Sequence, residues 1–277
     1  HTHHPPPTTH HPPPTTHHEG VRAMDLGLTG AKALVTGASR GIGRAIAATL
    51  AAEGCALALC ARGEEALAKA AAELRGEGAT VFAEPVDVTD PAALAGFVER
   101  AAGALDGLDL LVSNVSAGNV KGPESWEASL RGDLIPFAGL VEAALPHLEA
   151  SDRAAVVAIG TTNASDTARP AGANSYSALK AAVVQHASAL AHALAPKGIR
   201  VNTVSPGPID FPGGAWETIR TSRPEVYEEV LAKLPIGRYG TAEDVAAAVA
   251  FLLGRPGSFC VGVNLVVDGG LLTRVQY

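Results

Sequence analysis

The segment TGASRGIG, residues 36–43, decides how this chain folds. It follows an apolar run, KALVTG, that begins at Lys32, and it leads into an Ala-rich stretch of helical composition. Glycine at Gly37, Gly41 and Gly43 lets the backbone turn from a strand into a helix and approach a ligand closely. The free N–H groups and the positive dipole end of such a helix attract a phosphate group. The segment therefore predicts a strand–turn–helix unit that binds a pyrophosphate, although tight helix–strand packing also selects glycine.

Short apolar runs continue to alternate with Ala-rich helical stretches along the chain. Together with the first run, CALALC, TVFAE, LDLLVS, AAVVAIG, GIRVNTV and VNLVV make seven candidate strands. Asp90 before Pro91 is typical of a helix N-cap and first turn, and Thr241 with Asp244 is typical of a capping box. Alternating strands and helices favour βαβ units. The sequence predicts an α/β fold: a Rossmann-type, doubly wound parallel sheet of about seven strands with helices on both faces, in a single domain.

Two parts of the chain depart from this pattern. Residues 1–23 repeat HHPPPTT and hold seven of the ten histidines, and they directly precede Met24, the single methionine. A repeat this regular is typical of an appended, tag-like segment rather than a metal site. The domain then spans residues 24–277. Within it, residues 208–234 are the least regular part and contain Gly213 and Gly214 as possible hinges, which is typical of an active-site lid.

Composition and charge exclude several classes of protein. With 47% hydrophobic and 18% charged residues, the chain has the composition of a folded globular domain. Its net charge of −7 has the wrong sign for binding nucleic acid or an anionic membrane. The sequence contains no long apolar run and no C-x-x-C pair among its three cysteines. We expect no nucleic-acid partner, no membrane association and no metal, and the cysteines suit a reducing cytoplasm.

The segment SYSALK places Tyr176 and Lys180 four residues apart, on one face of a predicted helix. An adjacent ammonium group favours the phenolate form of a tyrosine, whose ordinary pKa is about 10. Such a pair can therefore transfer protons near neutral pH. Alone, the spacing is more typical of an ordinary surface pair. Together with the glycine turn, it favours a catalytic site.

In this combination the chain resembles the short-chain dehydrogenase/reductase family over essentially all of residues 24–277, and in particular its 3-oxoacyl-reductase-like members. TGASRGIG resembles the family's cofactor turn, and DVTD, SYSALK and GIRVNTVSPGPID are similar to its other markers in order and spacing. The resemblance implies that Tyr176 is the acid/base, and that Lys180 favours its ionised form and holds the nicotinamide ribose. It also implies that a hydroxyl, of Thr161 or of its neighbour Thr162, orients the substrate oxygen.

The predicted cofactor is NADP(H). Family members that use NAD carry an acidic residue at the end of the second strand, where this chain has Ala61 followed by Arg62. Arg62 and Arg40 can clamp a 2′-phosphate by charge-assisted hydrogen bonds; the alternative is that both are solvated loop charges. The resemblance implies that Asp87 and Val88 flank the adenine. The expected cofactor-binding residues are Gly37, Ser39, Arg40, Gly41, Ile42, Gly43, Arg62, Asp87, Val88, Asn114, Tyr176, Lys180, Pro206 and Gly207.

Three positions depart from the family's usual pattern. Ser113, Asn114, Val115 and Ser116 stand where the family has Asn-Asn-Ala-Gly, so only Asn114 corresponds. Asp133 replaces an asparagine that supports a proton-relay water, and an ionised Asp is able to pair directly with Lys180. Phe211 replaces a threonine that touches the cofactor. The candidate catalytic residues are Tyr176, Lys180, Thr161 and Asp133, the last shaping the proton path.

The sequence therefore predicts an enzyme that transfers a hydride between NADP(H) and a ketone or secondary alcohol. A 3-oxoacyl, sugar, polyol or other carbonyl substrate remains open. The alternative is an NADPH-binding regulatory or scaffold protein with impaired catalysis, which the altered residues at 113–116 and Asp133 favour and the Tyr176 and Lys180 pair opposes. The resemblance also implies a homotetramer or homodimer, with the helices around 124–148 and 175–195 at an interface.

Several remaining residues have a structural interpretation. His186 and His192 have no partner at ligand spacing, which favours packed histidines over metal ligands. Cys55 and Cys60 are interpreted as small core residues. In the region 208–234, Trp216 and Tyr227 either line a substrate pocket or only hold the lid in place. The tail after VDGG has no assigned role.

Overall fold

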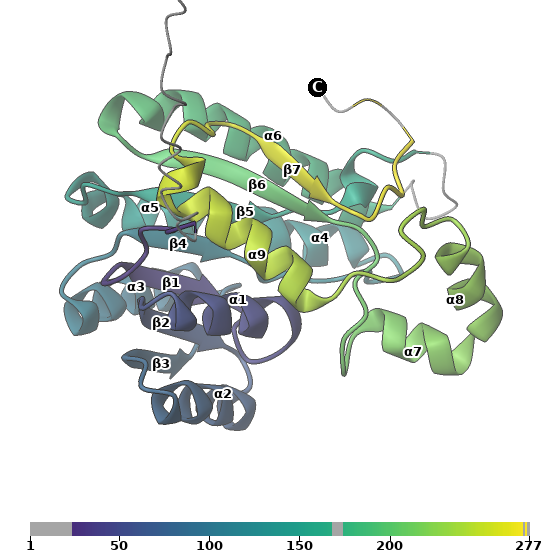
Figure 1. Ribbon diagram of the computed structural model, residues 1–277, viewed down its shortest axis with the longest axis horizontal. Helices are drawn as coiled ribbons and strands as arrows, with labels where there is room; N and C mark the ends of the chain where they lie inside the picture. The colour runs from purple at the N-terminus through teal and green to yellow at the C-terminus, as the bar shows by residue number, and fades with distance from the viewer. Residues whose placement is uncertain (1–23, 168–173, 274, 276–277) are drawn as a thin grey trace, which may run out of the picture.

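The computed structural model describes residues 24–167, 174–273 and 275, so the interpretation of residues 1–23 lies outside the described part. In the described residues, seven strands form one parallel sheet in the order β3-β2-β1-β4-β5-β6-β7 (Figure 1). The strands are β1 (Lys32–Thr36), β2 (Ala56–Ala61), β3 (Val81–Pro85), β4 (Leu110–Ser113), β5 (Ala155–Ile159), β6 (Arg200–Pro206) and β7 (Asn264–Val267). The chain builds outward from β1 to β3 and returns to β4 on the other side of β1. The predicted doubly wound single domain is confirmed.

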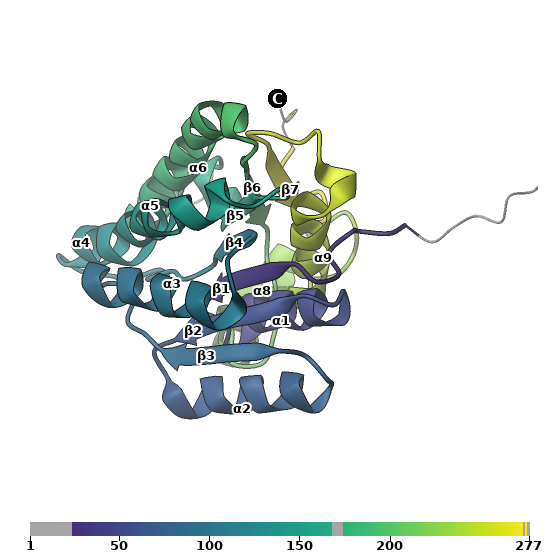
Figure 2. The same ribbon diagram turned by 90° about the vertical axis from the view of Figure 1, so that its left-hand side faces the viewer.

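Helices cover both faces of the sheet (Figure 2). One face carries α1 (Gly41–Ala52), α2 (Glu64–Gly76) and α9 (Ala242–Leu253), and the other carries α3 (Pro91–Leu105), α5 (Ile135–Glu149) and α6 (Ser175–Leu194). Successive strand residues point to opposite faces, so Ala33 and Val35 of β1 join the core under α1, whereas Leu34 joins the core under α3. Because both faces are buried, the strands are continuous apolar runs rather than alternating ones.

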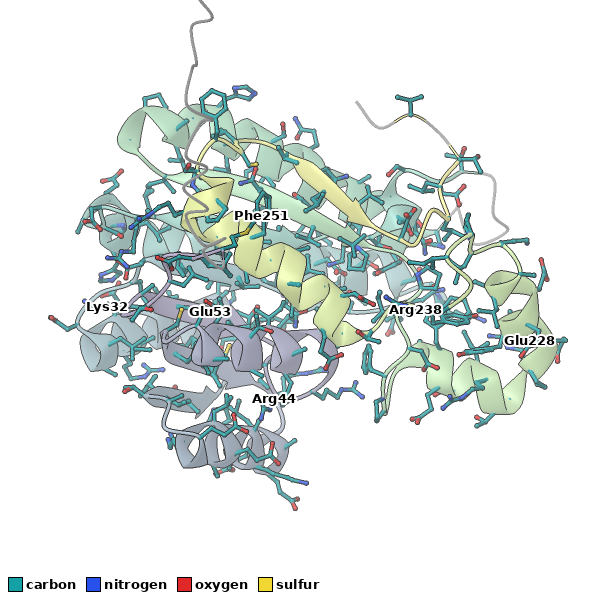
Figure 3. The ribbon with its side chains drawn as sticks, in the orientation of Figure 1. Lys32, Arg44, Glu53, Glu228, Arg238 and Phe251 are labelled. Carbon is teal, nitrogen blue, oxygen red and sulfur yellow. The ribbon has the colours of Figure 1, made fainter. Side chains whose placement is uncertain are left out.

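The predicted helix caps are confirmed. The carboxylate of Asp90 accepts hydrogen bonds from the N–H groups of Ala92 and Ala93, at 2.9 and 3.1 Å. Thr241 and Asp244 form a capping box at the start of α9. Arg238, which lies between α9 and the neighbouring helices (Figure 3), also donates two hydrogen bonds to Asp244. These bonds hold the pKa of Asp244 down to about 2, so the carboxylate of the capping box stays ionised through most of the acidic range.

The region 208–234 is more regular than its sequence suggests. It contains two short helices, α7 (Ala215–Ser222) and α8 (Pro224–Leu231), which project beyond the carboxyl end of β6 (Figure 1). They share a small core of their own, with Val230, Leu234 and Tyr239 buried at its centre. The glycine pair that precedes α7 ends the loop from β6, and Pro224 starts α8. The remaining short elements are α4 (Ser125–Ser129), the π-helical turn η1 (Leu130–Leu134), and the 3₁₀ turns η2 (Thr162–Ala164), η3 (Ala195–Lys197) and η4 (Arg255–Gly257).

Cys55, Cys60 and His186 are packing residues, whereas His192 is exposed on α6. Cys55 and Cys60 are buried, and burial raises the pKa of each thiol to about 12, which makes both inert. His186 packs edge-on against Phe137, with the ring centroids 5.8 Å apart. In the described part of the chain, the helices are too short or too polar for any one of them to span a bilayer.

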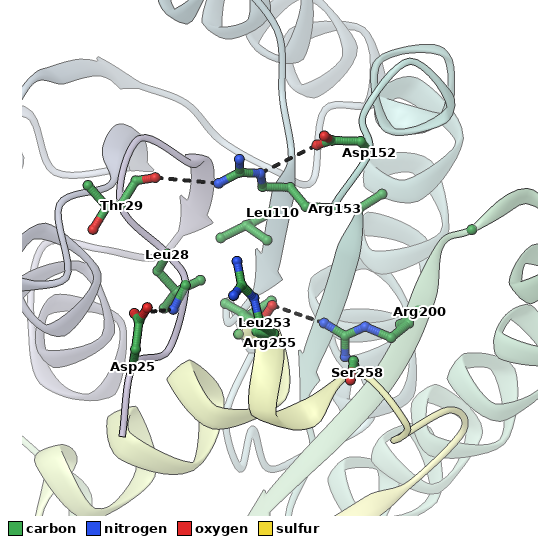
Figure 4. A pocket seen from close by; sticks show the side chains of 14 residues that line it. Asp25, Leu28, Thr29, Leu110, Asp152, Arg153, Arg200, Leu253, Arg255 and Ser258 are labelled. Atoms are coloured by element: carbon green, nitrogen blue, oxygen red, sulfur yellow. Dashed lines mark hydrogen bonds and ion pairs between the residues drawn. The ribbon is translucent and has the colours of Figure 1, made fainter. Parts of the chain in front are cut away.

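A cavity of about 520 Å³ opens at the amino-terminal edge of the sheet (Figure 4). On its wall, the Arg200 guanidinium donates hydrogen bonds to the carbonyls of Leu252 and Leu253 at the end of α9, and to that of Gly257. Carbonyls in the last turn of a helix have no partner within the helix, and a cation there also complements the helix dipole. Arg200 therefore ties β6 to the end of α9, and its burial lowers the pKa of the guanidinium.

We expect Arg200→Ala to lower the free energy of unfolding by about 2–3 kcal/mol, because it leaves half-buried carbonyls without a charged donor. Urea unfolding followed by circular dichroism measures this loss. Arg153→Ala is the matched control, since Arg153 lines the same cavity but makes only long contacts, 3.4 Å to the carbonyl of Thr29 and 3.5 Å to Asp152. The control should cost less than about 1 kcal/mol. Equal losses in the two variants would contradict the capping role.

Candidate functional site

The turn between β1 and α1 accepts only glycine at three positions. Gly37 and Gly41 have φ angles of +67° and +54°, in the left-handed region. Gly43 has no room for a side chain, because a Cβ atom there would lie 2.2 Å from the carbonyl oxygen of Gly37 and 2.4 Å from Nδ2 of Asn114. The first turn of α1 is therefore pressed against the end of β1, with its N–H groups at the carboxyl edge of the sheet.

Asn114, the one residue of the segment 113–116 that corresponds to the family pattern, holds this turn in place. Its Nδ2 group donates to the carbonyls of Thr36 and Gly37, at 3.1 and 3.2 Å, and its backbone N–H donates to the Thr36 hydroxyl at 3.0 Å. These bonds join the end of β4 to the end of β1. Asn114 thus has a structural role in addition to its expected place beside the cofactor.

A cavity of about 590 Å³, here called the glycine-turn cavity, lies at the carboxyl edge next to β1, where the strand order reverses. Ligands bind at this position in open α/β sheets. Of the expected cofactor-binding residues, it is lined by Gly37, Ser39, Arg40, Ile42, Arg62, Val88, Asn114 and Tyr176. Gly41 and Gly43 shape the turn beneath it. Asp87, Lys180, Pro206 and Gly207 do not line this cavity.

Asp87 is exposed and does not line the cavity. Its carboxylate accepts hydrogen bonds from the N–H and the hydroxyl of Thr89, at 3.0 and 2.8 Å, and these bonds lower the pKa of Asp87. Val88 is buried and contributes to the cavity wall. Val88 therefore lines the cavity, whereas the place of Asp87 beside the adenine stays a prediction.

Two arginines belong to the lining of the glycine-turn cavity. Arg40 and Arg62 both line it, and the described lining includes no Asp or Glu. Arg40 also donates a hydrogen bond of 2.9 Å to the carbonyl of Gly213, in the loop before α7. In the same loop, the Phe211 ring lies on Gly41 so closely that a Cβ atom at Gly41 would come within 2.5 Å of it. The loop therefore contacts the glycine turn directly.

A second, smaller cavity of about 300 Å³, here called the Trp216 cavity, adjoins the first. Tyr176, at the start of α6, lines both cavities. Thr161 and Thr162, just after β5, are both buried and line the Trp216 cavity. The Thr161 hydroxyl oxygen accepts a hydrogen bond of 3.3 Å from the N–H of Asn163, which leaves its proton free to be donated. The tyrosine and threonine hydroxyls thus face one small space.

The alternatives for Trp216 and Tyr227 are now separated. Trp216 lines the smaller cavity and also packs on Tyr239, with ring centroids 5.1 Å apart. Tyr227 does not line that cavity: it stacks on Tyr239 at 4.2 Å and donates a hydrogen bond of 2.9 Å to Asp210. Tyr227 therefore stabilises the packing of α7 and α8.

Sequence reasoning missed several residues that line the Trp216 cavity, among them Asn119 and Leu271. Asn119 comes from the loop after β4, and Leu271 comes from the tail after VDGG, which had no assigned role. Both segments lie outside regular helices and strands, so no hydrophobic period marks which of their residues point inward. Only their path back over the carboxyl edge brings them to the site.

Lys180 lies behind Tyr176 and lines neither cavity. Its ammonium group donates a hydrogen bond of 2.8 Å to the carbonyl of Ile159 and lies 3.1 Å from Oδ1 of Asp133. The lysine side chain is 4% exposed and the aspartate side chain is fully buried. The direct pairing that Asp133 made possible in the sequence is therefore present. Because Lys180 is buried, its charge acts on the site across the protein interior, where water screens it little.

This arrangement provides two chemical functions side by side. The glycine turn and the start of α1 offer N–H groups and a positive dipole to a pyrophosphate. The smaller cavity offers two hydroxyls, of Tyr176 and Thr161, to a polar oxygen, with a buried ammonium behind the tyrosine.

Comparison with known proteins agrees with this geometry. The family model described as enoyl-(acyl carrier protein) reductase matches residues 37–272. The chain is 36% identical over 255 residues to isoepoxydon dehydrogenase patN of Penicillium expansum, covering 91% of this chain and 98% of that protein. It is 32% identical over 244 residues to the 3-oxoacyl-[acyl-carrier-protein] reductase FabG of Escherichia coli K12, covering 86% and 96%.

A solved structure is similar over the same extent. It is the crystal structure of a short chain dehydrogenase from Burkholderia cenocepacia J2315 in complex with NADP. Its TM-score is 0.77 and its sequence identity 33%, covering 88% of this chain and 98% of that chain. The glycine turn beside β1, the Tyr176 and Lys180 pair on α6 and these similarities lead to one conclusion: the chain belongs to the short-chain dehydrogenase/reductase family.

Proposed function

We propose that this protein reduces a compact, uncharged ketone, or oxidises the matching secondary alcohol, with Tyr176 as the proton-transferring group. It is an NADP(H)-dependent oxidoreductase, as its relatives' names and the NADP in the similar Burkholderia structure indicate. The observation that supports the assignment of Tyr176 is its position, because it alone of the candidate catalytic residues lines both the glycine-turn cavity and the Trp216 cavity.

The glycine-turn cavity fits NADP(H). At Gly43 the backbone of Gly37 occupies the place where a Cβ atom would lie, so the start of α1 comes close to the end of β1. The turn therefore presents free N–H groups of α1 to a pyrophosphate. Arg40 and Arg62 line the cavity, and its described lining includes no Asp or Glu, which suits the extra phosphate of NADP. When bound, NADPH supplies the hydride for the carbonyl carbon.

The protein's own groups manage the substrate oxygen. In the reduction, Tyr176 donates its hydroxyl proton to the carbonyl oxygen as that oxygen gains negative charge; in the oxidation, it accepts the proton back. Thr161 donates a hydrogen bond to the same oxygen, with Thr162 as its near neighbour. Lys180 lies one helical turn after Tyr176, where its ammonium group favours the charged form of the tyrosine unless an opposing charge offsets it. It is also our candidate for binding the nicotinamide ribose, as the family resemblance implies. Asp133 acts through Lys180, as a positioning residue.

The Trp216 cavity supports a small and neutral substrate. Its volume of about 300 Å³ is at the lower end of the usual range for ligand pockets. Its described lining includes no charged side chain, so a free carboxylate or phosphate would find no counter-charge there. Trp216 and Ile219, both on α7, supply apolar contact. We further propose that residues 208–234 act as a lid, because α7 closes one side of this cavity.

We expect Tyr176→Phe to lower kcat at least about 100-fold, because the variant has no proton to donate, while NADPH still binds. The absorbance of the reduced nicotinamide during reaction with a panel of ketones and 3-oxoacyl thioesters measures turnover, and NADPH fluorescence measures binding. Tyr227→Phe is the matched control, since it removes only the bond to Asp210. Wild-type turnover by Tyr176→Phe would refute the assignment. NADPH binding by the natural chain with no turnover of any substrate would favour the regulatory alternative.

We expect the double variant Arg40→Ala/Arg62→Ala to lose about 10- to 100-fold in kcat/KM for NADPH and little for NADH, because only NADPH carries the 2′-phosphate. Both cofactors are compared at matched, subsaturating concentrations. Arg44→Ala is the control, because Arg44 lies on α1 but pairs with Glu73 at 3.0 Å, outside the lining of the cavity. Equal losses for NADPH and NADH would show that the two arginines are ordinary surface charges.

We also propose a homotetramer, or a homodimer, located in the cytoplasm, where the three free cysteines would stay reduced. The helices around 124–148 and 175–195 are the proposed interface. Trp126, Leu130 and Ile135 lie on the first of these and are 59%, 39% and 41% exposed, which is unusual for large apolar residues.

Light scattering coupled to size exclusion should therefore give a mass of two or four chains. The double variant Trp126→Lys/Ile135→Lys should shift the protein toward the mass of one chain, because it places charges on a buried apolar contact. As a control, Glu99→Lys changes an exposed charge on α3 without adding to this patch. A single-chain mass for the natural protein at all concentrations would contradict the proposed assembly.

A further inference from the structure

Asp133 and Lys180 form the one buried charged pair in the described part of the chain. No other Asp, Glu, Lys, Arg or His among the described residues is buried. Their charged atoms lie 3.1 Å apart, with side-chain exposures of 0% and 4%. Charges removed from water interact far more strongly than charges at a surface. Burying such a pair costs free energy, and its electric field acts strongly on neighbouring groups because little water screens it.

The fold holds Asp133 in this position from three sides. It lies in the π-helical turn η1, a wider turn than an α-helix makes, and such turns are frequent at functional sites. Its neighbour Gly132 packs on the loop after β4, where a Cβ atom would lie 2.7 Å from Cβ of Ala117. Oδ2 of Asp133 accepts a hydrogen bond from the N–H of Ala117 at 3.4 Å. Oδ1 faces Lys180 without an aligned hydrogen-bond donor in the described structure, so their link is mainly electrostatic.

Other charged groups on the elements around α6 are occupied elsewhere. Arg131 of η1 and Glu127 of α4 face each other at 3.9 Å on the surface. Lys197 of η3 pairs with Glu149, and Arg200 of β6 is bound to the end of α9. The strand β5 and the turn η2 contain no charged residue, and Asp166, just after η2, is only half-buried.

On α6 itself, the next titratable side chain after Lys180 is His186, which packs on Phe137 about two turns away. Tyr176 and Lys180 are one turn apart on the same face. The charge that reaches Tyr176 from the protein interior is therefore that of the Lys180 and Asp133 pair. A lone ammonium at this place would favour the ionised tyrosine, and a carboxylate 3.1 Å from that ammonium opposes the effect.

We propose that Asp133 neutralises Lys180, so that the buried pair gives Tyr176 little net positive charge and alcohol oxidation is restricted to higher pH. This proposal rests on the proposed role of Tyr176 as the proton-transferring group. In this arrangement Tyr176 retains its proton over a wider pH range and is available to donate it. The carboxylate thus slows alcohol oxidation near neutral pH, whereas an uncharged residue at position 133 would let oxidation proceed at lower pH; the equilibrium between ketone and alcohol is unchanged.

The variant Asp133→Asn tests this, because the amide keeps an acceptor for the Ala117 N–H and removes only the charge. We expect the acid limb of the kcat profile for NADP⁺-dependent alcohol oxidation to move down by about one pH unit. An ultraviolet titration of tyrosinate measures the same effect without turnover; the difference between each protein and its Tyr176→Phe counterpart isolates Tyr176 from the other tyrosines. Glu127→Gln, which removes an exposed carboxylate from α4, should match the natural protein in both measurements.

An Asp133→Asn protein that melts and binds NADPH like the natural one, yet shows an unchanged pH profile and titration, would overturn the proposal. Asp133→Ser, which also removes the charge and leaves space for water, is measured beside it. Loss of the folded state in both variants would assign Asp133 to stability alone and would likewise overturn it. If instead Tyr176→Phe retains full turnover, the proposed function fails, while the tyrosinate titration still decides whether Asp133 neutralises Lys180.

Discussion

The close approach of α1 to the end of β1 is the constraint on which the rest of the structure depends. Gly43 permits it, because any side chain there would collide with the carbonyl of Gly37 and with Asn114. The approach aims the start of α1 at the carboxyl edge of the sheet, beside the point where the strand order reverses. The same contact brings the amide of Asn114 onto the turn, so that β1, β4 and α1 are fixed together. A pyrophosphate site follows from backbone geometry rather than from a charged side chain.

The candidate catalytic groups are placed by a second framework, which comes from later parts of the chain. The strand β5 ends at Ile159, two residues before Thr161, and α6 begins one residue before Tyr176, so both residues line the same small cavity. The ammonium group of Lys180 is held by a hydrogen bond to the carbonyl of Ile159 and by its ion pair with Asp133. A charged group held in this way needs little reorganisation when charge develops on the substrate oxygen. Strands and helices fix the positions of these side chains. The loop with Phe211 packs on the glycine turn, and α7 forms part of the wall of the smaller cavity.

Several expectations changed when the chain was folded, each for an identifiable reason. Asp87 satisfies its carboxylate with Thr89 in a local turn, so it leaves Val88 to line the cavity. Residues 208–234 appeared irregular because α7 and α8 are short and are interrupted at Arg223, yet they pack on a core of their own. Trp216 and Tyr227 lie in the same region, and only the direction of each side chain separates a cavity wall from a packing contact.

By itself, the sequence determined the α/β class, the seven strands and the helix caps, and it predicted the chemistry at Tyr176 and Lys180, because each is encoded in a local pattern of glycines, apolar runs or fixed spacing. Only the tertiary structure decided that Asp133 pairs with Lys180, that Arg40 and Arg62 line the same cavity, and that Asn119 and Leu271 help to line the smaller one. These contacts join segments that are distant in sequence. The distances between these side chains depend on the order of the strands in the sheet, which no local sequence pattern predicts.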